Sequence, residues 1–133
     1  MEYERLAVDL KLGDKVTFHG LKTRQEVADF MRSADLYVLS SLWENCSTSA
    51  AEALATGIPI LATRCGGTEE FVIKDVGLLV PPGDAHILCN GLDYMLDNLH
   101  LYSCKRISQY AIECFSPELV GAKLHAVYQS LSS

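Results

Sequence analysis

Several classes of protein are excluded by what this sequence lacks. No apolar run in its 133 residues approaches the length of roughly 18 residues that a membrane-spanning helix requires. Met1 is followed by Glu2-Tyr3-Glu4-Arg5, which does not match a secretory signal. Eleven basic residues stand against seventeen acidic ones, and the net charge is −6. Because the basic residues form no cluster, we expect no nucleic acid partner.

A disulfide framework and a zinc site are also disfavoured. The five cysteines are an odd number and include no Cys-x-x-Cys pair. This usage predicts a reducing compartment, and therefore the cytoplasm. The four histidines are scattered singly, so we interpret them as surface or packing residues and expect no metal. The cysteines are Cys46, Cys65, Cys89, Cys104 and Cys114, and the histidines are His19, His86, His100 and His125.

Strand and helix signals alternate along the chain as far as residue 97. This alternation predicts an α/β fold with a parallel sheet of about four strands flanked by helices, in one domain over residues 1–133. The expected strands are 16–19, 36–40, 60–62 and 77–80. The expected helices are 2–12 (stopped by Gly13), 24–33 (with a Thr23-x-x-Glu26 capping box), one from Ser47 or Ser49 to Gly57, 68–73, 85–97, 100–114 and 117–131.

Two carboxylates bracket the segment that joins the expected strand 36–40 to the next helix. Glu44 follows the strand, and Glu52 lies one to two turns into the helix. In an open parallel sheet, ligands bind at the carboxyl ends of the strands. A helix N-terminus favours phosphate, and the hydroxyls at 47–49 add donors there. Carboxylates accept hydrogen bonds from sugar hydroxyls, so a ligand that carries both phosphate and sugar would satisfy the segment.

Structural explanations compete with this interpretation. Glu52 with Ser49 fits a capping box, and Glu44 could be an ordinary solvated loop residue. Cys46 lies at the helix start, but no histidine is near it in sequence to act as a base, so a catalytic thiol is disfavoured. Trp43 is better explained as a packing residue than as a stacking platform.

A second candidate loop follows the strand at 60–62. Gly66 and Gly67 permit a positive φ and a close approach of the backbone to a ligand. Glu69 and Glu70 stand in the first turn of the next helix, where the helix dipole alone could explain them. The glycine pair lacks the spacing of a dinucleotide fingerprint or a P-loop, so alone it is a weak signal.

Taken together, these segments resemble the carboxy-terminal domain of the family 4 (group 1) retaining glycosyltransferases, which have the GT-B fold. The matches occur in the same order across most of the chain, and six collinear matches are a strong signal. They are the strand Val16–Gly20, the strand Ala34–Ser41, the Glu44-x7-Glu52 spacing, the run Glu52–Ile60, the Gly66-Gly67-x-x-Glu70 motif and the run Gly77–Asp84.

The resemblance implies a Rossmann-like domain that binds a UDP- or GDP-linked sugar and contributes to hexosyl transfer with retention of configuration, in carbohydrate biosynthesis. By analogy, Glu44 would be the catalytic-site acid on the hydroxyls of the sugar, and Glu52 would bind the ribose. The backbone amides around Cys46, Ser47, Thr48 and Ser49 would face the sugar and the distal phosphate, and Gly20 with Leu21 would lie near the base. Gly66, Gly67 and Glu70 form the second loop. The donor is a substrate, and no cofactor is expected.

Two departures from the family pattern affect these expectations. Where the family often has Glu-Gly-Phe-Gly, this chain has Glu44-Asn45-Cys46-Ser47, which tightens the backbone and adds side chains beside the sugar. The family's opening strand, its Arg- and Lys-bearing loop and its acceptor domain have no counterpart here, and Arg64 does not match that basic pair. We therefore interpret the chain as a fragment that needs the missing amino-terminal domain. Alone it should be inactive, bind nucleotides weakly and self-associate through exposed sheet edges.

Two other functions stay open. One is a non-catalytic α/β scaffolding or regulatory module that kept the fold, which the altered loop at 44–47 favours. The other is a GT-B epimerase or phosphorylase, but a phosphorylase would need a pyridoxal-binding lysine in a fitting motif, and no such motif is present. The base, the sugar and the acceptor are not specified by the sequence. In the full-length protein, the inner face of the membrane is an alternative location to the open cytoplasm.

Overall fold

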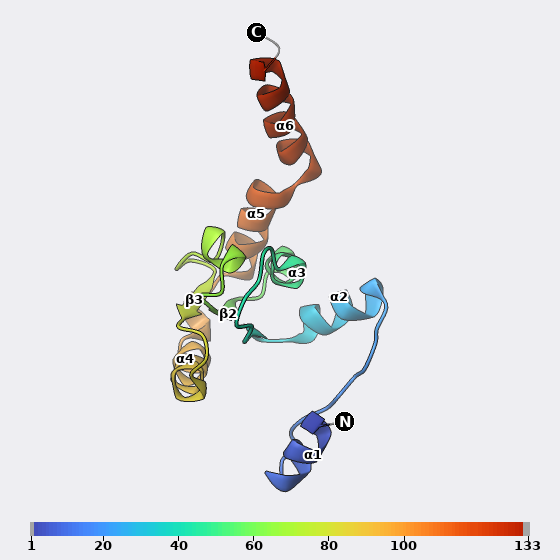
Figure 1. Cartoon of the computed structure of the whole chain (residues 1–133), viewed down its shortest axis with the longest axis vertical. Helices are drawn as coiled ribbons and strands as arrows, with labels where there is room; N and C mark the ends of the chain where they lie inside the picture. Colours follow the sequence, from blue (N-terminus) through green and yellow to red (C-terminus); the bar gives the residue numbers. More distant parts are fainter. Residues whose placement is uncertain (1, 132–133) are drawn as a thin grey trace.

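A computed structural model describes residues 2–131 and confirms the predicted α/β fold. Over these residues the elements run in the order α1 (Glu2–Asp9), α2 (Arg24–Ser33), β1 (Tyr37–Leu39), α3 (Thr48–Thr56), β2 (Ile60–Thr63), the 3₁₀ helix η1 (Gly67–Glu70), β3 (Gly77–Val80), α4 (Ala85–Asp97), the 3₁₀ helix η2 (Leu99–Leu101), α5 (Cys104–Phe115) and α6 (Pro117–Leu131). Figure 1 shows α1 and α6 extending from opposite ends of the central body.

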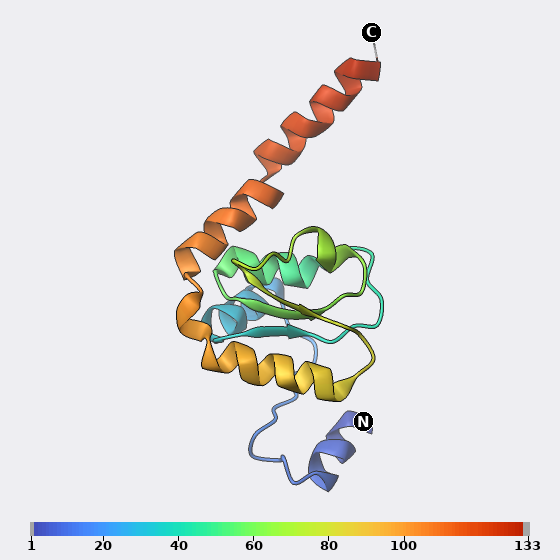
Figure 2. The same ribbon diagram turned by 90° about the vertical axis from the view of Figure 1, so that its left-hand side faces the viewer.

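The sheet of the described residues has three parallel strands in the order β1-β2-β3. Tyr37 is in register with Ile60, and Ile60 with Gly77. Helices cover both faces: α3 lies on one side and α4 on the other (Figure 2). β2 is buried along its whole length, as expected of a parallel strand with both faces covered.

Two apolar clusters hold these layers together, because successive side chains of β2 point to opposite faces. Ile60 and Ala62 pack with α3 and α5 in the larger cluster, which includes Leu54 and Ile107. Leu61 points the other way, into the smaller cluster formed with α4. The β2 side chains named here are all 0% exposed, so this strand fixes the position of the loops at its carboxyl end.

The expected strand at 16–19 does not form. Residues 16–20 have no regular structure, and Val16 and Phe18 are 39% and 44% exposed. A strand is held by hydrogen bonds to a neighbour, and β1 pairs only with β2 among the described strands. Figure 1 shows this segment running between α1 and α2, apart from the sheet. An apolar pattern alone was therefore not enough to make residues 16–19 a strand.

The first helix also ends earlier than expected. Its last helical residue is Asp9, and Lys11 adopts a left-handed conformation with φ of 56°. The N–H of Lys11 donates to the carbonyl of Val8 at 2.9 Å, and that of Leu12 to Ala7 at 2.8 Å. This is a Schellman motif with Lys11 at C′, so Gly13 is not the stop that the sequence predicted.

Other boundaries differ by a few residues. The predicted helix at 68–73 is a single 3₁₀ turn over Gly67–Glu70, and the predicted helix at 100–114 divides into η2 and α5. The division falls at Ser103, whose hydroxyl caps α5 by accepting the N–H of Arg106 at 3.4 Å. The capping box at Thr23 forms as predicted, and its backbone and side-chain hydrogen bonds lower the pKa of Glu26.

Candidate functional site

The loops after β1 and β2 are hydrogen-bonded to each other at the carboxyl end of the sheet. The N–H of Glu44 donates to the carbonyl of Cys65 at 2.8 Å, and the N–H of Gly67 donates to the carbonyl of Glu44 at 3.0 Å. An isolated parallel bridge joins Glu44 and Gly66. The two candidate loops predicted from sequence are therefore parts of one continuous rim, which we define as residues 41–47 and 64–68.

The glycine pair in this rim is explained by contact between the two loops. A Cβ on Gly67 would lie 2.0 Å from the carbonyl oxygen of Asn45, and a Cβ on Gly66 would lie 2.7 Å from that of Glu44. Gly66 also has a φ of +106°, which favours glycine. The sequence predicted close approach to a ligand, whereas the structure shows close approach to the neighbouring backbone.

Two hydroxyl groups, those of Thr63 and Ser41, make hydrogen bonds within the Glu44 loop. The hydroxyl of Thr63, the last residue of β2, donates to the carbonyl of Ser41. The hydroxyl of Ser41 donates to the Glu44 carboxylate at 2.8 Å. Glu44 is half-buried, so this carboxylate has a fixed position at the rim and keeps part of its surface in solvent. Ser41 and Thr63 were not identified from sequence: Thr63 bonds a residue 22 positions away, although Ser41 lies only three positions from Glu44.

Helix α3 begins next to this carboxylate. Ser47 is the N-cap, is 4% exposed, and its hydroxyl accepts the N–H of Ala50 at 3.3 Å. The first intrahelical bond runs from the N–H of Ala51 to the carbonyl of Ser47. The amides of Thr48 and Ser49 precede that bond, as the first amides of any helix do. They give the rim two N–H groups for an anion.

The alternative capping box at Ser49 and Glu52 is wrong. The capping residue is Ser47, and the residue three positions later is Ala50, which has no carboxylate to accept the backbone N–H of the capping residue. The Ser49 hydroxyl lies 2.7 Å from the Tyr37 phenol oxygen instead. The side chain of Glu52 is thus not needed to close the helix start. Cys46 is exposed and is a free thiol.

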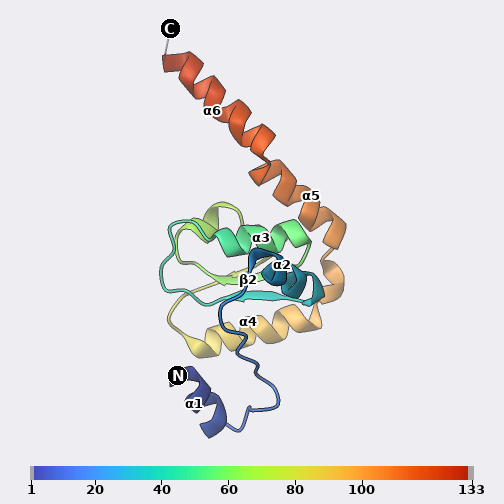
Figure 3. The same ribbon diagram turned by 90° about the vertical axis from the view of Figure 1, so that its right-hand side faces the viewer.

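Glu52 faces a cavity that does not include Glu44. This cavity has a volume of about 260 Å³ and lies between α2 and α3, lined by Glu52, Arg24 and Arg32 among others. The two helices lie side by side (Figure 3). The two acids therefore belong to different features: Glu44 to the rim, and Glu52 to the groove that α2 forms with the middle and end of α3. Arg24 and Arg32 were not considered as site residues from the sequence.

Gly20 and Leu21 line a separate, mainly apolar cavity of about 500 Å³. Gly20 has a φ of +64°, and Leu21 is fully exposed. The cavity extends to Tyr37 on β1, and Met31 lines both this cavity and the one that contains Glu52. The segment predicted to lie near a base is therefore next to the Glu52 groove, on the side of α2. Glu70, at the end of η1, is exposed.

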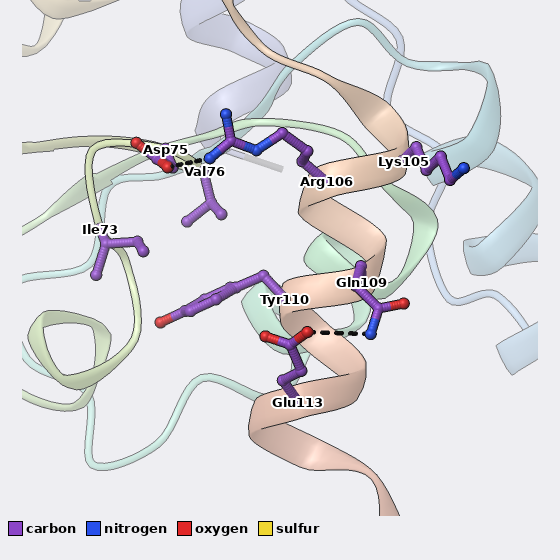
Figure 4. Close-up of a pocket in the computed structure, with 8 residues that line it drawn as sticks. All are labelled: Ile73, Asp75, Val76, Lys105, Arg106, Gln109, Tyr110 and Glu113. Carbon is purple, nitrogen blue, oxygen red and sulfur yellow. Dashed lines mark hydrogen bonds and ion pairs between the residues drawn. The ribbon is translucent and has the colours of Figure 1, made fainter.

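Another cavity lies at the opposite edge of the sheet. It has a volume of about 340 Å³ and lies between α5 and the residues that precede β3 (Figure 4). Arg106 and Asp75 form an ion pair across it at 2.6 Å. The Tyr110 phenol donates to the carbonyl of Phe71 at 2.9 Å. None of the candidate residues predicted from sequence lines this cavity, so it is distinct from the rim.

Across residues 2–131, no three His, Cys, Asp or Glu side chains lie close enough to hold a metal ion. No helix in the same range combines the length and the apolar character needed to cross a membrane. Arg64, which does not match the family's basic pair, forms an exposed ion pair with Glu69 at 3.7 Å.

Comparison with known sequences gave one family and several relatives. The family described as "Glycosyl transferases group 1" matches residues 1–113. An MMP alpha-(1->4)-mannosyltransferase from Mycolicibacterium hassiacum is 33% identical over 132 residues, which cover 95% of this chain and 32% of that protein. A D-inositol 3-phosphate glycosyltransferase from Mycobacteroides abscessus is 42% identical over 77 residues, or 57% of this chain and 17% of that protein.

Solved structures share the fold. Sucrose-phosphate synthase from Thermosynechococcus elongatus has a TM-score of 0.87 and 31% identity, covering 98% of this chain and 33% of that chain. Anabaena Alr3699/HepE, solved in complex with UDP, has a TM-score of 0.85 and 22% identity, covering 97% and 36% respectively, and supports the fold alone. The chain thus spans about a third of the length of the mannosyltransferase (32%) and of the two solved structures (33% and 36%).

Proposed function

Because the chain belongs to the group 1 glycosyl transferases, we propose that it is the donor-binding part of a GT-B hexosyltransferase. The donor is a UDP- or GDP-linked sugar, and the transfer retains the anomeric configuration. One observation carries the proposal: the bridge between Glu44 and Gly66 joins two loops into a rim beside the free amides of α3. Carboxylate and amides at one strand end match the hydroxyls and phosphates of such a donor.

The proposed roles combine the family resemblance with this geometry. Glu44, held by Ser41, accepts hydrogen bonds from hydroxyls of the transferred sugar. The amides of Thr48 and Ser49 face the diphosphate, where the helix dipole favours negative charge. Glu52 accepts from the ribose hydroxyls in the neighbouring groove. Stabilising the leaving diphosphate and the developing positive charge on the sugar is then the main catalytic contribution.

The remaining predicted residues have supporting roles in this proposal. Gly20 and Leu21 lie on the α2 side of the groove, where the base would extend from the ribose. Gly66 and Gly67 bring the second loop against the first, and Glu70 ends η1 behind it. Placement in the cytoplasm is supported by the five free cysteines.

An amino-terminal domain is proposed as the partner that supplies the acceptor. Among the described strands, β1 pairs with β2 alone, and its open side supports self-association of the chain when no such partner covers it.

A non-catalytic binding module is the second candidate. The observation that favours it is the separation of the two acids, because the cavity lined by Glu52 does not include Glu44. A module that binds a nucleotide without positioning a sugar for transfer would need only the groove and the α3 amides. The two functions differ in whether the sugar of the donor adds affinity.

Isothermal titration calorimetry on the 133-residue chain tests the proposal. UDP, GDP and their glucose and mannose conjugates are the probes. We expect binding, with a tighter Kd for one conjugate than for its bare nucleotide, and a loss of about tenfold in Glu52→Gln, because a hydrogen bond to a charged group is removed. Glu113→Gln, an exposed change on α5 in the opposite cavity, is the matched control.

Binding of nucleotides with no gain from any sugar would favour the non-catalytic module. No binding of any of these probes would overturn the donor-binding proposal. We expect no sugar transfer by the chain alone, because the acceptor would be held by another domain.

A further inference from the structure

The groove between α2 and α3 contains opposite charges that are not paired with each other in the described residues. It is lined by the buried side chain of Met31 and by the small side chains of Ala28 and Ala55. At about 260 Å³ it is slightly smaller than the usual 300–1,000 Å³ of a complete small-molecule pocket. Its size therefore suits one moiety of a larger ligand rather than the whole molecule.

The two arginines of this groove differ in their partners. Arg32 donates to the carboxylate of Asp29 at 2.8 Å, one turn away on α2. The side chain of Arg24 makes no hydrogen bond or ion pair among residues 2–131, and the same is true of the side chain of Glu52 across the groove. Both are exposed. A free guanidinium and a free carboxylate on one cavity provide donors and acceptors for a ligand that has both.

The position of Arg24 in its helix adds to this. Arg24 is the first residue of α2, directly after the N-cap Thr23. A positive charge at a helix N-terminus is opposed by the helix dipole, which favours acidic residues there. No hydrogen bond or ion pair to the Arg24 side chain within the described part of the chain offsets this cost. A ligand that accepts hydrogen bonds from the Arg24 guanidinium would offset this cost.

We infer that Arg24 is a specificity-determining residue that reads the nucleotide base, a deepening that rests on the donor-binding function proposed above. Glu52 holds the ribose hydroxyls, and the Arg24 guanidinium donates to a carbonyl oxygen of the base. The diphosphate lies at the amides of α3, so the ligand reaches Arg24 from the ribose end. Leu21, three residues before Arg24, lines the neighbouring apolar cavity, where it would border the base.

The chemistry of the guanidinium selects the class of base. It has five N–H donors and no acceptor, so it binds bases that present carbonyl oxygens. Uracil has two, and guanine presents O6 beside N7, the pair that arginine recognises in nucleic acids. Adenine has no carbonyl oxygen, and beside N7 it presents an amino group, which is a hydrogen-bond donor like the N–H groups of the guanidinium. Arg24 should therefore favour UDP and GDP over ADP.

Calorimetry with UDP, GDP and ADP on the 133-residue chain tests the inference. Arg24→Met keeps the length of the side chain and removes its charge and donors. We expect UDP and GDP to bind the wild-type chain at least tenfold more tightly than ADP, and Arg24→Met to abolish that preference. Arg32→Met is the matched control, since it lines the same groove but is already paired, and it should keep the preference. Far-UV circular dichroism verifies that both variants are folded.

The outcomes separate this inference from the proposed function. If the wild-type chain binds UDP or GDP, Glu52→Gln weakens binding and Arg24→Met leaves the base preference unchanged, then Arg24 does not read the base and the donor-binding function stands. Equal affinity of the wild-type chain for ADP and for UDP or GDP would likewise overturn the role of Arg24 and leave the donor-binding function standing. Failure of the wild-type chain to bind any nucleotide would overturn both.

Discussion

Replacing Gly67 with alanine is expected to separate the two loops of the rim. The Cβ of the new residue would lie 2.0 Å from the carbonyl oxygen of Asn45 and 3.0 Å from the Cα of Cys46. Both contacts are with backbone, so no side-chain rotation relieves them. Gly67 is not among the residues with a positive φ, and its backbone conformation therefore suits alanine. The cost comes from the contact alone.

The size of the effect can be worked out from two terms. Forcing extra volume into a packed site costs about 1–3 kcal/mol. Moving the loop apart also weakens the hydrogen bonds that Glu44 makes with Cys65 at 2.8 Å and with Gly67 at 3.0 Å. Each is worth about 0.5–1.5 kcal/mol net. We expect Gly67→Ala to lower the free energy of unfolding by about 2–6 kcal/mol.

Urea unfolding measured by far-UV circular dichroism gives this free energy. Trp43 is the only tryptophan and is 76% exposed in the displaced loop, so its fluorescence reports the loop directly. Gly13→Ala is the control, because nothing lies within 4 Å of its added Cβ. A change below about 0.5 kcal/mol in Gly67→Ala, well under the overpacking range, with unchanged Trp43 emission, would refute the argument that the glycine permits the loop contact.

Two further predictions concern stability. Ser47→Ala removes the N-cap of α3 and should lower the free energy of unfolding in urea by about 1 kcal/mol. Ser108→Ala is the control and should lower it much less, because the Ser108 hydroxyl donates to the carbonyl of Lys105 within the same helix. Equal effects of the two changes would contradict the capping role. Burial, followed by the neighbouring Cys114, raises the pKa of Tyr110 to about 12. Because the folded state then holds this proton more tightly than the unfolded state, its stabilising contribution is complete below pH 10 and is lost as pH rises toward 12. The free energy of unfolding of Tyr110→Phe should fall less over that range, and parallel pH profiles of the two proteins would exclude the mechanism.

Local signals predicted most of the helices and strands. Gly57 ends α3 in a left-handed conformation, and Asp84 caps α4 with two hydrogen bonds from backbone amides. Both signals involve residues within one turn of each other, so a linear pattern contains them. The bounds of β3 and α4 agree with the prediction. The strand expected at 16–19 failed because its formation depends on a neighbouring strand, which no local pattern can supply.

The candidate site was predicted unevenly for the same reason. The sequence placed Glu44, Ser47 and the glycine pair near strand ends, and the structure joins them in one rim. It did not separate Glu44 from the cavity that Glu52 lines, nor did it bring Arg24 to that cavity. Arg24 and Glu52 lie on different helices, and their proximity depends on how α2 packs against α3. The roles of these residues stay predictions until binding is measured.

The sequence by itself determined the order of the elements, their caps and the family, because these depend on neighbouring residues and on motifs in a fixed order. Only the tertiary structure decided which groups meet. The bridge from Glu44 to Gly66 spans 22 positions in the chain, and it exists because parallel strands place the ends of β1 and β2 side by side. The division of charged groups between the rim and the α2–α3 groove follows from that packing.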